Sequence, residues 1–415
     1  VQVYADVAQL ETTTAALGQV IGNRSIVDLP LNQRNVYQLM FLVPGTTGTV
    51  SNTFNGMNLS VNGGRPGTSD ILIDGIPAAP PLVNPIQGFS AFPSVEAVQE
   101  FKMETNSYPA EFGRSGSGIV NIILKSGTNQ FHGSAYEFLR NSAMDANNYF
   151  NNLHGTPLPS FKRSQFGASL GGPVEIPKLY DGKSKTFFFF SYEGLRQGTA
   201  AQLTATVPTA LQRTGDFSQT LNSAGQHVVI YDPTTTTPSG TGYVRQPYLN
   251  NVIPSGDIDP VAAKIVNYYP LPNTAGTVAG LNNYFATGTA IVNINTFDAK
   301  VDEVFNDRNR MFVRYSRRNY AQPGTILFPA AVKVAEGGGS TASEPEISNG
   351  AAIDYTFTPS PTYVMEFRYG FSRMFLNWTA NSTGFNPSTE LGFPGYIAAN
   401  ADHLLFPGIA PANYF

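Results

Sequence analysis

Hydrophobic and polar residues alternate along much of the chain after residue 130. The alternation is clearest in residues 297–302, 311–316 and 363–371. Because successive side chains of a strand point to opposite faces of a sheet, this period of two predicts strands with one apolar and one polar face. Weaker alternation predicts further strands at residues 131–140, 163–170, 188–192 and 353–357. This part of the chain therefore predicts about seven strands.

The links between these expected strands are long and short in turn. Residues 306–309 and 359–362 form short links, whereas residues 196–295 and 319–349 form long ones. Outer-membrane barrels have short periplasmic turns and long external loops, while a soluble β-sandwich has no reason to place its long loops at one end. The pattern predicts strands of an antiparallel transmembrane β-barrel, with the two long links as external loops.

The strand at residues 363–371 shows the expected difference between its two faces most clearly. Every second residue from Tyr363 to Phe371 is aromatic or Met, and the positions between them include Glu366 and Arg368. In a barrel of this kind the apolar face contacts lipid and the polar face contacts the interior. We therefore expect Phe367 to face lipid and Arg368 to face the interior.

Before residue 130 the pattern is mixed. The apolar spacing in residues 36–43 is helical and ends at Pro44-Gly45, and Ser94 is placed to cap a short helical turn. That turn is expected to carry its apolar residues on one face, namely Val95, Ala97, Val98 and Phe101. Runs rich in β-branched residues are found at 59–61, 71–77 and 119–124. Together these features predict an α+β domain ahead of the barrel strands.

Three consecutive motifs stand at the end of this first domain. They are VEAVQEF at residues 95–101, FGRSGSG at residues 112–118 and IVNIILK at residues 119–125. In this order they resemble the end of the plug domain of TonB-dependent outer-membrane receptors, and ILIDGIP at residues 71–77 resembles another strand of that family.

Two further stretches are similar to the Oar-like subfamily of these receptors. They are residues 110–141 and LPLNQRN at residues 29–35, in which Gln33 stands where the subfamily usually has glycine. Members of this subfamily carry a carboxypeptidase-regulatory-like domain ahead of the plug.

The resemblance implies a mainly β protein with three parts. Residues 1–10 would be the remnant of a preceding domain or a TonB-box-like segment, residues 11–129 the plug, and residues 130–415 the N-terminal part of the barrel. It also implies a location in the outer membrane and substrate uptake driven by the inner-membrane proton gradient through TonB. The expected partners are TonB with its inner-membrane energising complex, outer-membrane lipid and an unidentified transported ligand, without a cofactor.

The resemblance also marks candidate site residues. Val1, Val3 and Val7 lie in an extended segment that would contact TonB by adding a strand to a sheet edge of that partner, although a leftover linking strand explains them equally well. The plug-motif and plug–barrel residues are Arg65, Asp74, Gly75, Glu111, Gly113, Arg114 and Gly118. Their charged members are candidates for charge-assisted hydrogen bonds to the inner barrel wall, with ordinary solvated loop charge as the alternative.

Composition narrows the possible chemistry. Charged residues make up 13% of the 415 residues, and a net charge of −4 gives no basic surface for nucleic acid. The chain has no cysteine and its four histidines are isolated, so we expect no metal site. We also expect no enzyme, because no nucleophile motif occurs and the glycines at 113–118 lack the Lys-Ser/Thr pair of a phosphate-binding loop. Asp259, followed by Pro260, is expected to cap a helix rather than to bind calcium.

A secreted or surface β-sandwich that acts as an adhesin or binds carbohydrate is the alternative function. Dependence on detergent would separate a barrel from such a sandwich. Plugged transporters of the outer membrane close with about 22 strands, and an open sheet edge is not stable in lipid. The predicted strands therefore imply further ones beyond residue 415, and the start at Val1, without Met, implies a missing N-terminal part.

Overall fold

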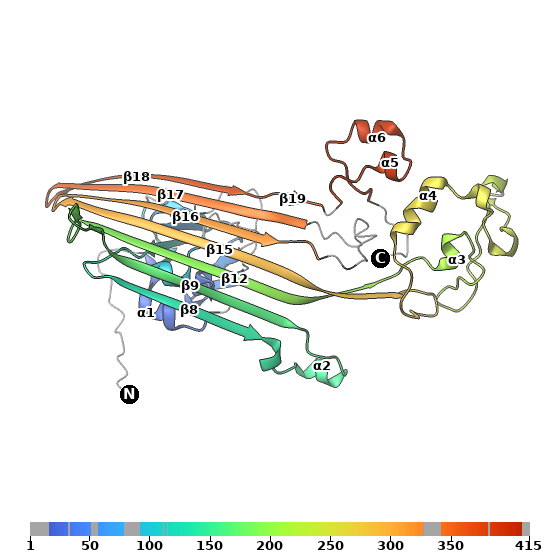
Figure 1. Ribbon diagram of the computed structural model, residues 1–415, viewed down its shortest axis with the longest axis horizontal. Helices are drawn as coiled ribbons and strands as arrows, with labels where there is room; N and C mark the ends of the chain where they lie inside the picture. Colours follow the sequence, from blue (N-terminus) through green and yellow to red (C-terminus); the bar gives the residue numbers. More distant parts are fainter. Residues whose placement is uncertain are drawn as a thin grey trace.

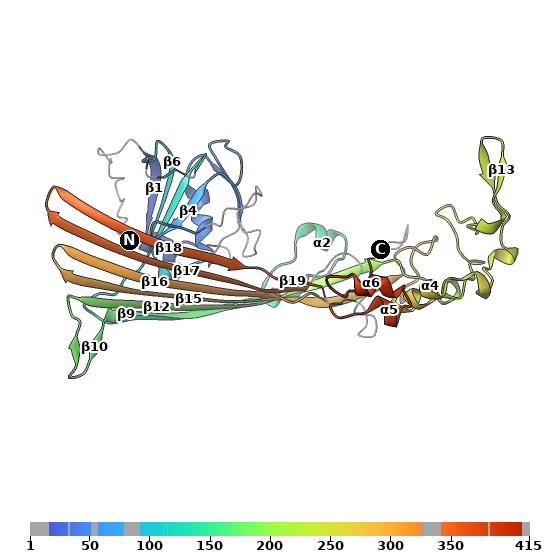
Figure 2. The same cartoon turned by 90° about the horizontal axis from the view of Figure 1, so that it is seen from above.

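The computed structural model describes residues 16–31, 34–50, 57–78, 92–110, 112–113, 115–325, 327, 342–380 and 382–408. A long twisted sheet carries a smaller α+β domain on one face, and large loops extend from one end of the sheet (Figure 1). Figure 2 shows the sheet nearly edge-on, with the smaller domain on one side of it. We call the long sheet the wall and the smaller domain the plug.

In the described part of the chain, the wall is a sheet of eight strands, of which one is short. The strands are β8 (His132–Asn141), β9 (Phe161–Pro173), β12 (Thr186–Ala205), β15 (Tyr284–Asn306), β16 (Asn309–Gln322), β17 (Ala342–Ser360), β18 (Tyr363–Phe375) and the short β19 (Trp378–Thr379). Their order is β18-β17-β16-β15-β12-β9-β8, with β19 beside β17. Each long strand thus pairs antiparallel with the next one in the sequence, as in the side of a barrel, and the predicted strands are confirmed.

The wall strands are longer than their alternation predicts. β12 pairs with β15 along its whole length, so the first long link covers residues 206–283 rather than 196–295. β16 and β17 continue pairing beyond the expected ends of the second link, to Gln322 and from Ala342, and most of the residues between them lie outside the described part of the chain. About 9–11 residues suffice to cross the hydrocarbon layer. Outside that layer the ladder hydrogen bonds continue while the two faces no longer need different polarity.

The plug is built on a five-stranded sheet with the order β1-β6-β7-β4-β5, in which β4 and β7 are parallel. The strands are β1 (Leu17–Gly22), β4 (Asp70–Ile73), β5 (Ile76–Pro77), β6 (Val98–Asn106) and β7 (Ile119–Leu124). The remaining elements are α1 (Asn23–Asp28), η2 (Val36–Leu42), η3 (Val95–Ala97) and the hairpin of β2 (Thr46–Val50) with β3 (Met57–Val61). Tyr37, Phe101 and Met103 are fully buried in the plug core.

Two local predictions for the plug need correction. Ser94 caps a helical turn as expected, accepting from the N–H of Ala97 at 3.2 Å, but the turn ends at Ala97 and Phe101 lies on strand β6. β6 is bonded on both sides, by β1 and β7, and these ladders override the local helical spacing. Residues 71–77 form a hairpin with its turn at Asp74-Gly75, rather than one continuous strand.

The loops at one end of the wall contain their own secondary structure (Figure 1). Between β8 and β9 lie η4 (Ser142–Met144) and α2 (Tyr149–Leu153), and α5 (Pro387–Glu390) and α6 (Gly395–Ala399) follow β19. Residues 206–283 contain α3 (Ala210–Arg213), η5 (Pro233–Thr235), β13 (Thr237–Ser239), β14 (Gly242–Val244), η6 (Leu249–Asn251), η7 (Ser255–Asp257), α4 (Pro260–Ile265) and η8 (Val266–Tyr268). Asp259 caps α4 by accepting from Val261 N at 2.8 Å, which confirms the expected helix.

At the opposite end the wall strands are joined by short turns, and β10 (Glu175–Ile176) pairs with β11 (Tyr180–Asp181) between β9 and β12. Within the described residues, no helix combines the length and the apolar character that crossing a membrane requires.

Candidate functional site at the plug–wall interface

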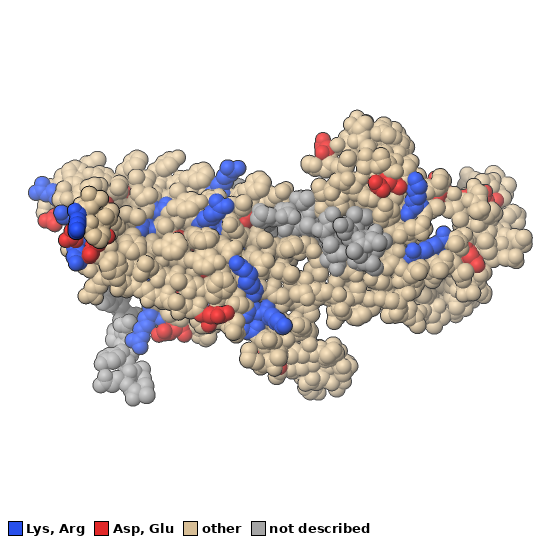
Figure 3. All heavy atoms as spheres, viewed as in Figure 1, with Lys and Arg blue, Asp and Glu red and all other residues tan. Residues whose placement is uncertain are grey.

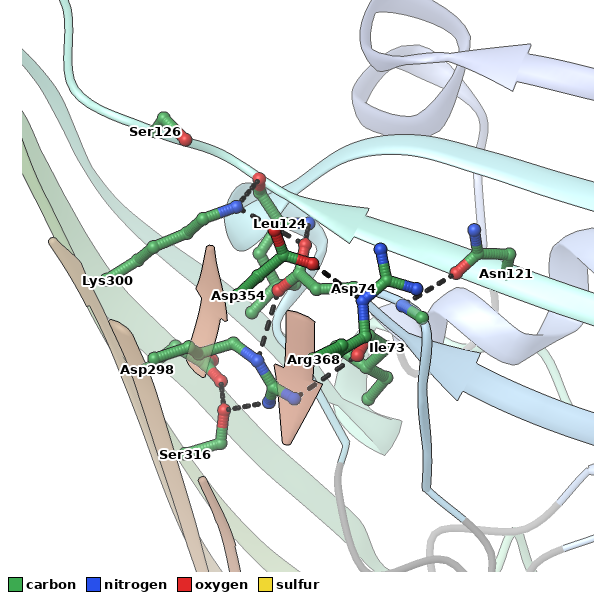
Figure 4. Close-up of polar contacts among 12 residues, drawn as sticks. Ile73, Asp74, Asn121, Leu124, Ser126, Asp298, Lys300, Ser316, Asp354 and Arg368 are labelled. Carbon is green, nitrogen blue, oxygen red and sulfur yellow. Dashed lines mark hydrogen bonds and ion pairs between the residues drawn. The ribbon is translucent and has the colours of Figure 1, made fainter. Parts of the chain in front are cut away.

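The turn between β4 and β5 places Asp74 against the wall. Asp74 and Gly75 have positive φ angles of 48° and 74°, which turn the chain sharply at the edge of the plug sheet. The buried Asp74 carboxylate lies 3.3 Å from Lys300 Nζ (Figure 4) and 3.1 Å from Arg314 Nε. Lys300 belongs to β15 and Arg314 to β16. One carboxylate of the plug is therefore paired with cations from two wall strands.

The same two cations also bond to the plug backbone. Arg314 Nη2 donates to the carbonyl of Ile73 at 3.2 Å, and Lys300 Nζ donates to the carbonyl of Leu124 at 3.4 Å. The N–H of Leu124 in turn donates to Asp74 Oδ1 at 3.1 Å. Arg314 Nε faces Asp74 Oδ2 as an ion pair without the alignment of a hydrogen bond. Because buried charges are costly unless paired, this interlinked cluster favours one position of the plug on the wall.

A second carboxylate, Asp298 on β15, extends the cluster along the wall. Ser316 Oγ donates to Asp298 Oδ1 at 2.7 Å, and Arg314 Nη1 donates to Ser316 Oγ at 3.0 Å. All three side chains are buried. Asp74 and Asp298 thus lie in one network of buried polar groups with Arg314 and Ser316.

The turn at Gly75 also contacts β18. A Cβ atom at position 75 would overlap the guanidinium of Arg368, so the side chain of Arg368 occupies the space that glycine leaves open. Arg368 Nε donates to Asp354 Oδ2 on β17 at 2.7 Å, and the guanidinium also pairs with Glu366. The N–H of Gly75 donates to Asn121 Oδ1 at 3.3 Å within the plug.

Gly370 makes a similar close approach two residues further along β18. A Cβ atom there would overlap the side chain of Ile76, which follows the plug turn. The positions of β18 that include Arg368 and Gly370 therefore face the plug, whereas Phe367 on the other face is 63% exposed. This confirms the predicted difference between the two faces of the strand.

Arg34 forms a second connection, between the plug and β8. Its Nη2 pairs with Glu96 Oε1 at 3.0 Å within the plug, and both side chains are mostly buried. The guanidinium lies 4.3 Å from the ring centre of Phe138 and 4.9 Å from that of Tyr136, both on β8. Cation–π contacts strengthen when water is excluded, so Arg34 adds a directional contact to this edge of the wall. In the sequence, Arg34 is marked only by its place in LPLNQRN.

Arg318 on β16 lies at a third contact. Its Nη1 pairs with Glu346 Oε1 at 2.7 Å, and its guanidinium lies 4.0 Å from the ring centre of Phe92 in the plug.

A cavity of about 30 Å³ lies between plug and wall beside Arg34, Arg318 and Tyr37, which is enough for one water molecule. Burial raises the pKa of Tyr37 above its usual range, so its phenol remains neutral there.

The remaining predicted plug residues lie in different surroundings. Arg65 is exposed and its carbonyl accepts from Thr68 Oγ1 at 2.7 Å, while its side chain makes no hydrogen bond or ion pair with the described residues. A Cβ at Gly118 would come within 3.2 Å of Val61, whereas one at Gly113 would meet no described atom within 4 Å. The other predicted positions lie outside the described residues, namely Val1, Val3, Val7, Glu111 and Arg114.

The charged wall residues that meet the plug are the part of the site that sequence reasoning missed. Alternation places Lys300 and Arg314 on the polar faces of their strands, but it does not pair them with Asp74. Among the residues that the structure describes, no three His, Asp or Glu side chains gather as they would around a metal ion. The site is therefore an arrangement of ion pairs and hydrogen bonds between two domains.

An antiparallel wall with a small domain on its charged face is the arrangement of a plugged outer-membrane β-barrel. A family model described as "Outer membrane beta barrel domain" matches residues 123–415. The chain belongs to this family, and it is located in the outer membrane. The alternative of a secreted β-sandwich is thereby removed, and the resemblance to TonB-dependent receptors is confirmed together with the similar proteins described next.

Three named proteins are similar to this chain. The TonB-dependent transporter Oar of Myxococcus xanthus is 27% identical over 198 residues, which cover 41% of this chain and 18% of Oar. The outer membrane transporter YddB from Escherichia coli is 14% identical with a TM-score of 0.52, over 86% of this chain and 39% of YddB. The siderophore receptor PirA from Acinetobacter baumannii is 13% identical with a TM-score of 0.48, over 86% of this chain and 40% of PirA.

This chain spans less than half the length of each of these three proteins. The similarity to YddB supports the fold of a plug with part of a barrel. Oar and YddB are both named as transporters.

Proposed function

We propose that this chain forms the plug and the first barrel strands of a TonB-dependent transporter or receptor, which takes up a substrate across the outer membrane. In this proposal the plug spans residues 11–129 and the barrel part residues 130–415. The observation that carries it is the attachment of the plug to the wall through one buried carboxylate, Asp74, between Lys300 and Arg314. Such an attachment closes the barrel at rest and is released when a few directional contacts break.

TonB would supply the energy for that release from the inner-membrane proton gradient. The segment that contains Val1, Val3 and Val7 would bind TonB by strand addition, as extended segments bind exposed sheet edges. It leads into β1, which is the edge strand of the plug sheet and pairs with β6. A pull on this segment would therefore act first on the edge of the plug sheet, while the wall strands stay bonded to their neighbours.

The external loops would meet the transported ligand first. Residues 206–283 form the largest of them and extend far beyond the end of the wall (Figure 1). Uptake would then require the ligand to pass from these loops to the plug and along the charged wall face that the plug leaves.

A labelling experiment in cells tests this proposal, because this chain has no cysteine of its own. Ile76 is 8% exposed at the contact between the plug and β18, so a thiol introduced by Ile76→Cys in the full-length protein is shielded at rest. We expect a hydrophilic maleimide to label it several-fold faster in cells with active TonB than in cells without TonB. Asp307→Cys, in the exposed turn after β15, is the control and should be labelled equally in both.

Equal labelling of the thiol at position 76 with and without TonB, while the control reacts normally, would contradict TonB-driven movement of the plug. An uncoupler that removes the inner-membrane proton gradient should lower the labelling at position 76 to the level of cells that lack TonB.

A further inference from the structure

The hairpin formed by β10 and β11 stands out from the wall at the end with the short turns. Figure 2 shows it on the side of the sheet opposite to the plug, pointing away from the plug. The plug lies on the interior side of the wall, so the opposite side is the one that faces lipid. Since short turns of outer-membrane barrels lie at the periplasmic side, the hairpin extends outward over the inner leaflet of the membrane.

The hairpin has a defined conformation. In the register of the two strands, Glu175 lies opposite Asp181 and Ile176 lies opposite Tyr180. The N–H of Leu179 donates to the carbonyl of Ile176 at 2.9 Å. The turn between the two strands includes Lys178, which has a φ of 65°. These bonds define the turn at the tip of the hairpin.

Large apolar side chains are exposed at the tip of this hairpin. Leu179 is 80% exposed, Ile176 is 47% exposed and Tyr180 is 39% exposed. Exposed apolar groups that lie this close together are unfavourable in water and indicate a surface that contacts a partner. Tyr is also a residue that prefers the boundary between lipid and water, where its ring is in an apolar layer and its hydroxyl is solvated.

Three lysines lie in or just after this hairpin, at positions 178, 183 and 185. Figure 3, which views the side of the wall away from the plug, shows basic and acidic side chains together at the hairpin end. Lys183 Nζ pairs with Glu175 Oε1 at 3.2 Å, whereas Lys178 and Lys185 form no ion pair with the described residues. An apolar tip beside unpaired ammonium groups matches a phospholipid surface, with acyl chains below anionic phosphates.

We propose that the β10–β11 hairpin docks onto the phospholipid interface of the inner leaflet of the outer membrane. Leu179 and Tyr180 enter the boundary between acyl chains and headgroups, and the ammonium group of Lys178 contacts lipid phosphate. The hairpin thereby sets the depth and tilt of the wall beside β9 and β12. This role rests on the membrane location and on the geometry of the wall, and it is independent of the proposed transport.

Fluorescence quenching by lipids tests this docking in the full-length protein. The protein carrying Leu179→Cys is labelled with a fluorophore and reconstituted in vesicles of phosphatidylethanolamine and phosphatidylglycerol that contain a lipid with a spin label near its headgroup. We expect at least twofold stronger quenching at position 179 than at a label introduced by Asp307→Cys, a turn at the same end of the wall. Equal or weaker quenching at position 179 would overturn the proposal.

The lysine contact has a separate measurement. Added to the Leu179→Cys protein, Lys178→Gln should reduce the increase in quenching that phosphatidylglycerol produces over phosphatidylethanolamine alone. Lys162→Gln, at the loop end of β9, is the matched control and should leave that increase unchanged. If both substitutions leave it unchanged, the contact between Lys178 and phosphate is wrong.

Photocrosslinking in cells distinguishes lipid from a protein partner. A photoreactive amino acid in place of Leu179 should give adducts with phospholipid. Adducts with a periplasmic protein in their place would assign the hairpin to a protein interface and overturn the lipid proposal. Because none of these measurements involves TonB, a failure of the plug-labelling experiment leaves this proposal intact.

Discussion

Arg368 of the wall occupies the space beside Gly75 of the plug where any larger residue would place its Cβ atom. Gly75 also has a φ of 74°, a conformation that favours glycine. Next to it in the same turn, Asp74 holds Lys300 and Arg314. The Asp-Gly dipeptide therefore contributes to the interface in two ways. The Asp74 carboxylate pairs with two cations of the wall, and the absence of a side chain at Gly75 leaves space for the Arg368 guanidinium.

Gly75→Ala should weaken the attachment of the plug to the wall. The left-handed conformation costs a residue with a Cβ atom about 1–2 kcal/mol, and the added Cβ would also displace the Arg368 guanidinium from the turn. We expect a higher single-channel conductance in planar bilayers and faster proteolysis of the plug in the full-length protein. Gly63→Ala is a matched control, because Gly63 has a φ of 76° but open space around it.

If the backbone alone mattered, Gly63→Ala and Gly75→Ala would have equal effects. A larger effect at position 75 assigns the difference to Arg368. Equal conductance and equal proteolysis for the two variants would contradict the steric argument.

Asp74→Asn should destabilise the plug–wall interface strongly. The amide keeps the shape of the side chain but leaves Lys300 and Arg314 buried without their plug carboxylate. Removing one partner of a buried ion pair costs about 3–5 kcal/mol. The loss should appear as reduced protection from hydrogen exchange at the amides of Ile122 and Leu124, which neighbour the site.

Asp28→Asn provides the control for the loss of a charge alone. Asp28 pairs with Arg24 on an exposed helix, and such surface pairs contribute about 0–1 kcal/mol. In the Asp28→Asn variant, the protection of the Ile122 and Leu124 amides from hydrogen exchange should remain close to that in the unmodified protein. If Asp74→Asn were equally harmless, the buried cluster would not hold the plug.

The parts of this molecule that were predictable from sequence depend on local periodicity. The alternation that places Phe367 and Arg368 on opposite faces is visible in neighbouring residues of the sequence. The same alternation predicts the other wall strands. The pairing of Asp74 with Lys300 and Arg314 depends on how two separately folded units pack, and alternation carries no information on that packing. Phe101 illustrates the same limit, because its strand is stabilised by ladders to distant segments.

Alternation underestimates the length of the wall strands for a related reason. Alternation reports only where the two faces of a strand meet different surroundings. The ladder between β12 and β15 continues to Ala205 and Tyr284, where lipid and interior no longer impose that difference. Backbone hydrogen bonds extend the strands there without leaving a pattern in the side chains.

Asn283→Ala should loosen the base of the large external loop. Asn283 is buried and spans the loop ends, since its Oδ1 accepts from the N–H of Val207 at 2.8 Å and its Nδ2 donates to the carbonyl of Val207 at 2.8 Å. Leaving buried groups unpaired costs about 1–3 kcal/mol each. We expect faster hydrogen exchange at Val207 and faster cleavage within residues 206–283 by a protease added outside the cell.

The matched control for this loop is Asn273→Ala. Asn273 makes the same two kinds of bond, with the N–H and the carbonyl of Phe285, but it is exposed. Water can replace both of its bonds, so its removal should have a much smaller effect on exchange and cleavage. Similar effects of the two variants would show that burial of Asn283 does not stabilise the loop.

Phe367 and Arg368 give the most direct test of the wall as a membrane barrel. In the full-length protein, Phe367→Arg places a charge on the lipid face near the middle of β18, which should cost about 2–4 kcal/mol. Arg368→Gln should keep the ladder of β18, because the side chain faces the interior, but it should weaken plug attachment through the lost contact with Gly75 and leave the buried Asp354 without its ion pair. Loss of stability alone does not identify the lipid face, since a protein core would also be harmed by Phe367→Arg.

A lipid-soluble spin quencher makes that distinction, when its quenching of a label at position 367 is compared with its quenching of a label at position 368. We expect stronger quenching at 367, and equal quenching or stronger quenching at 368 would contradict the assignment of this strand to the barrel.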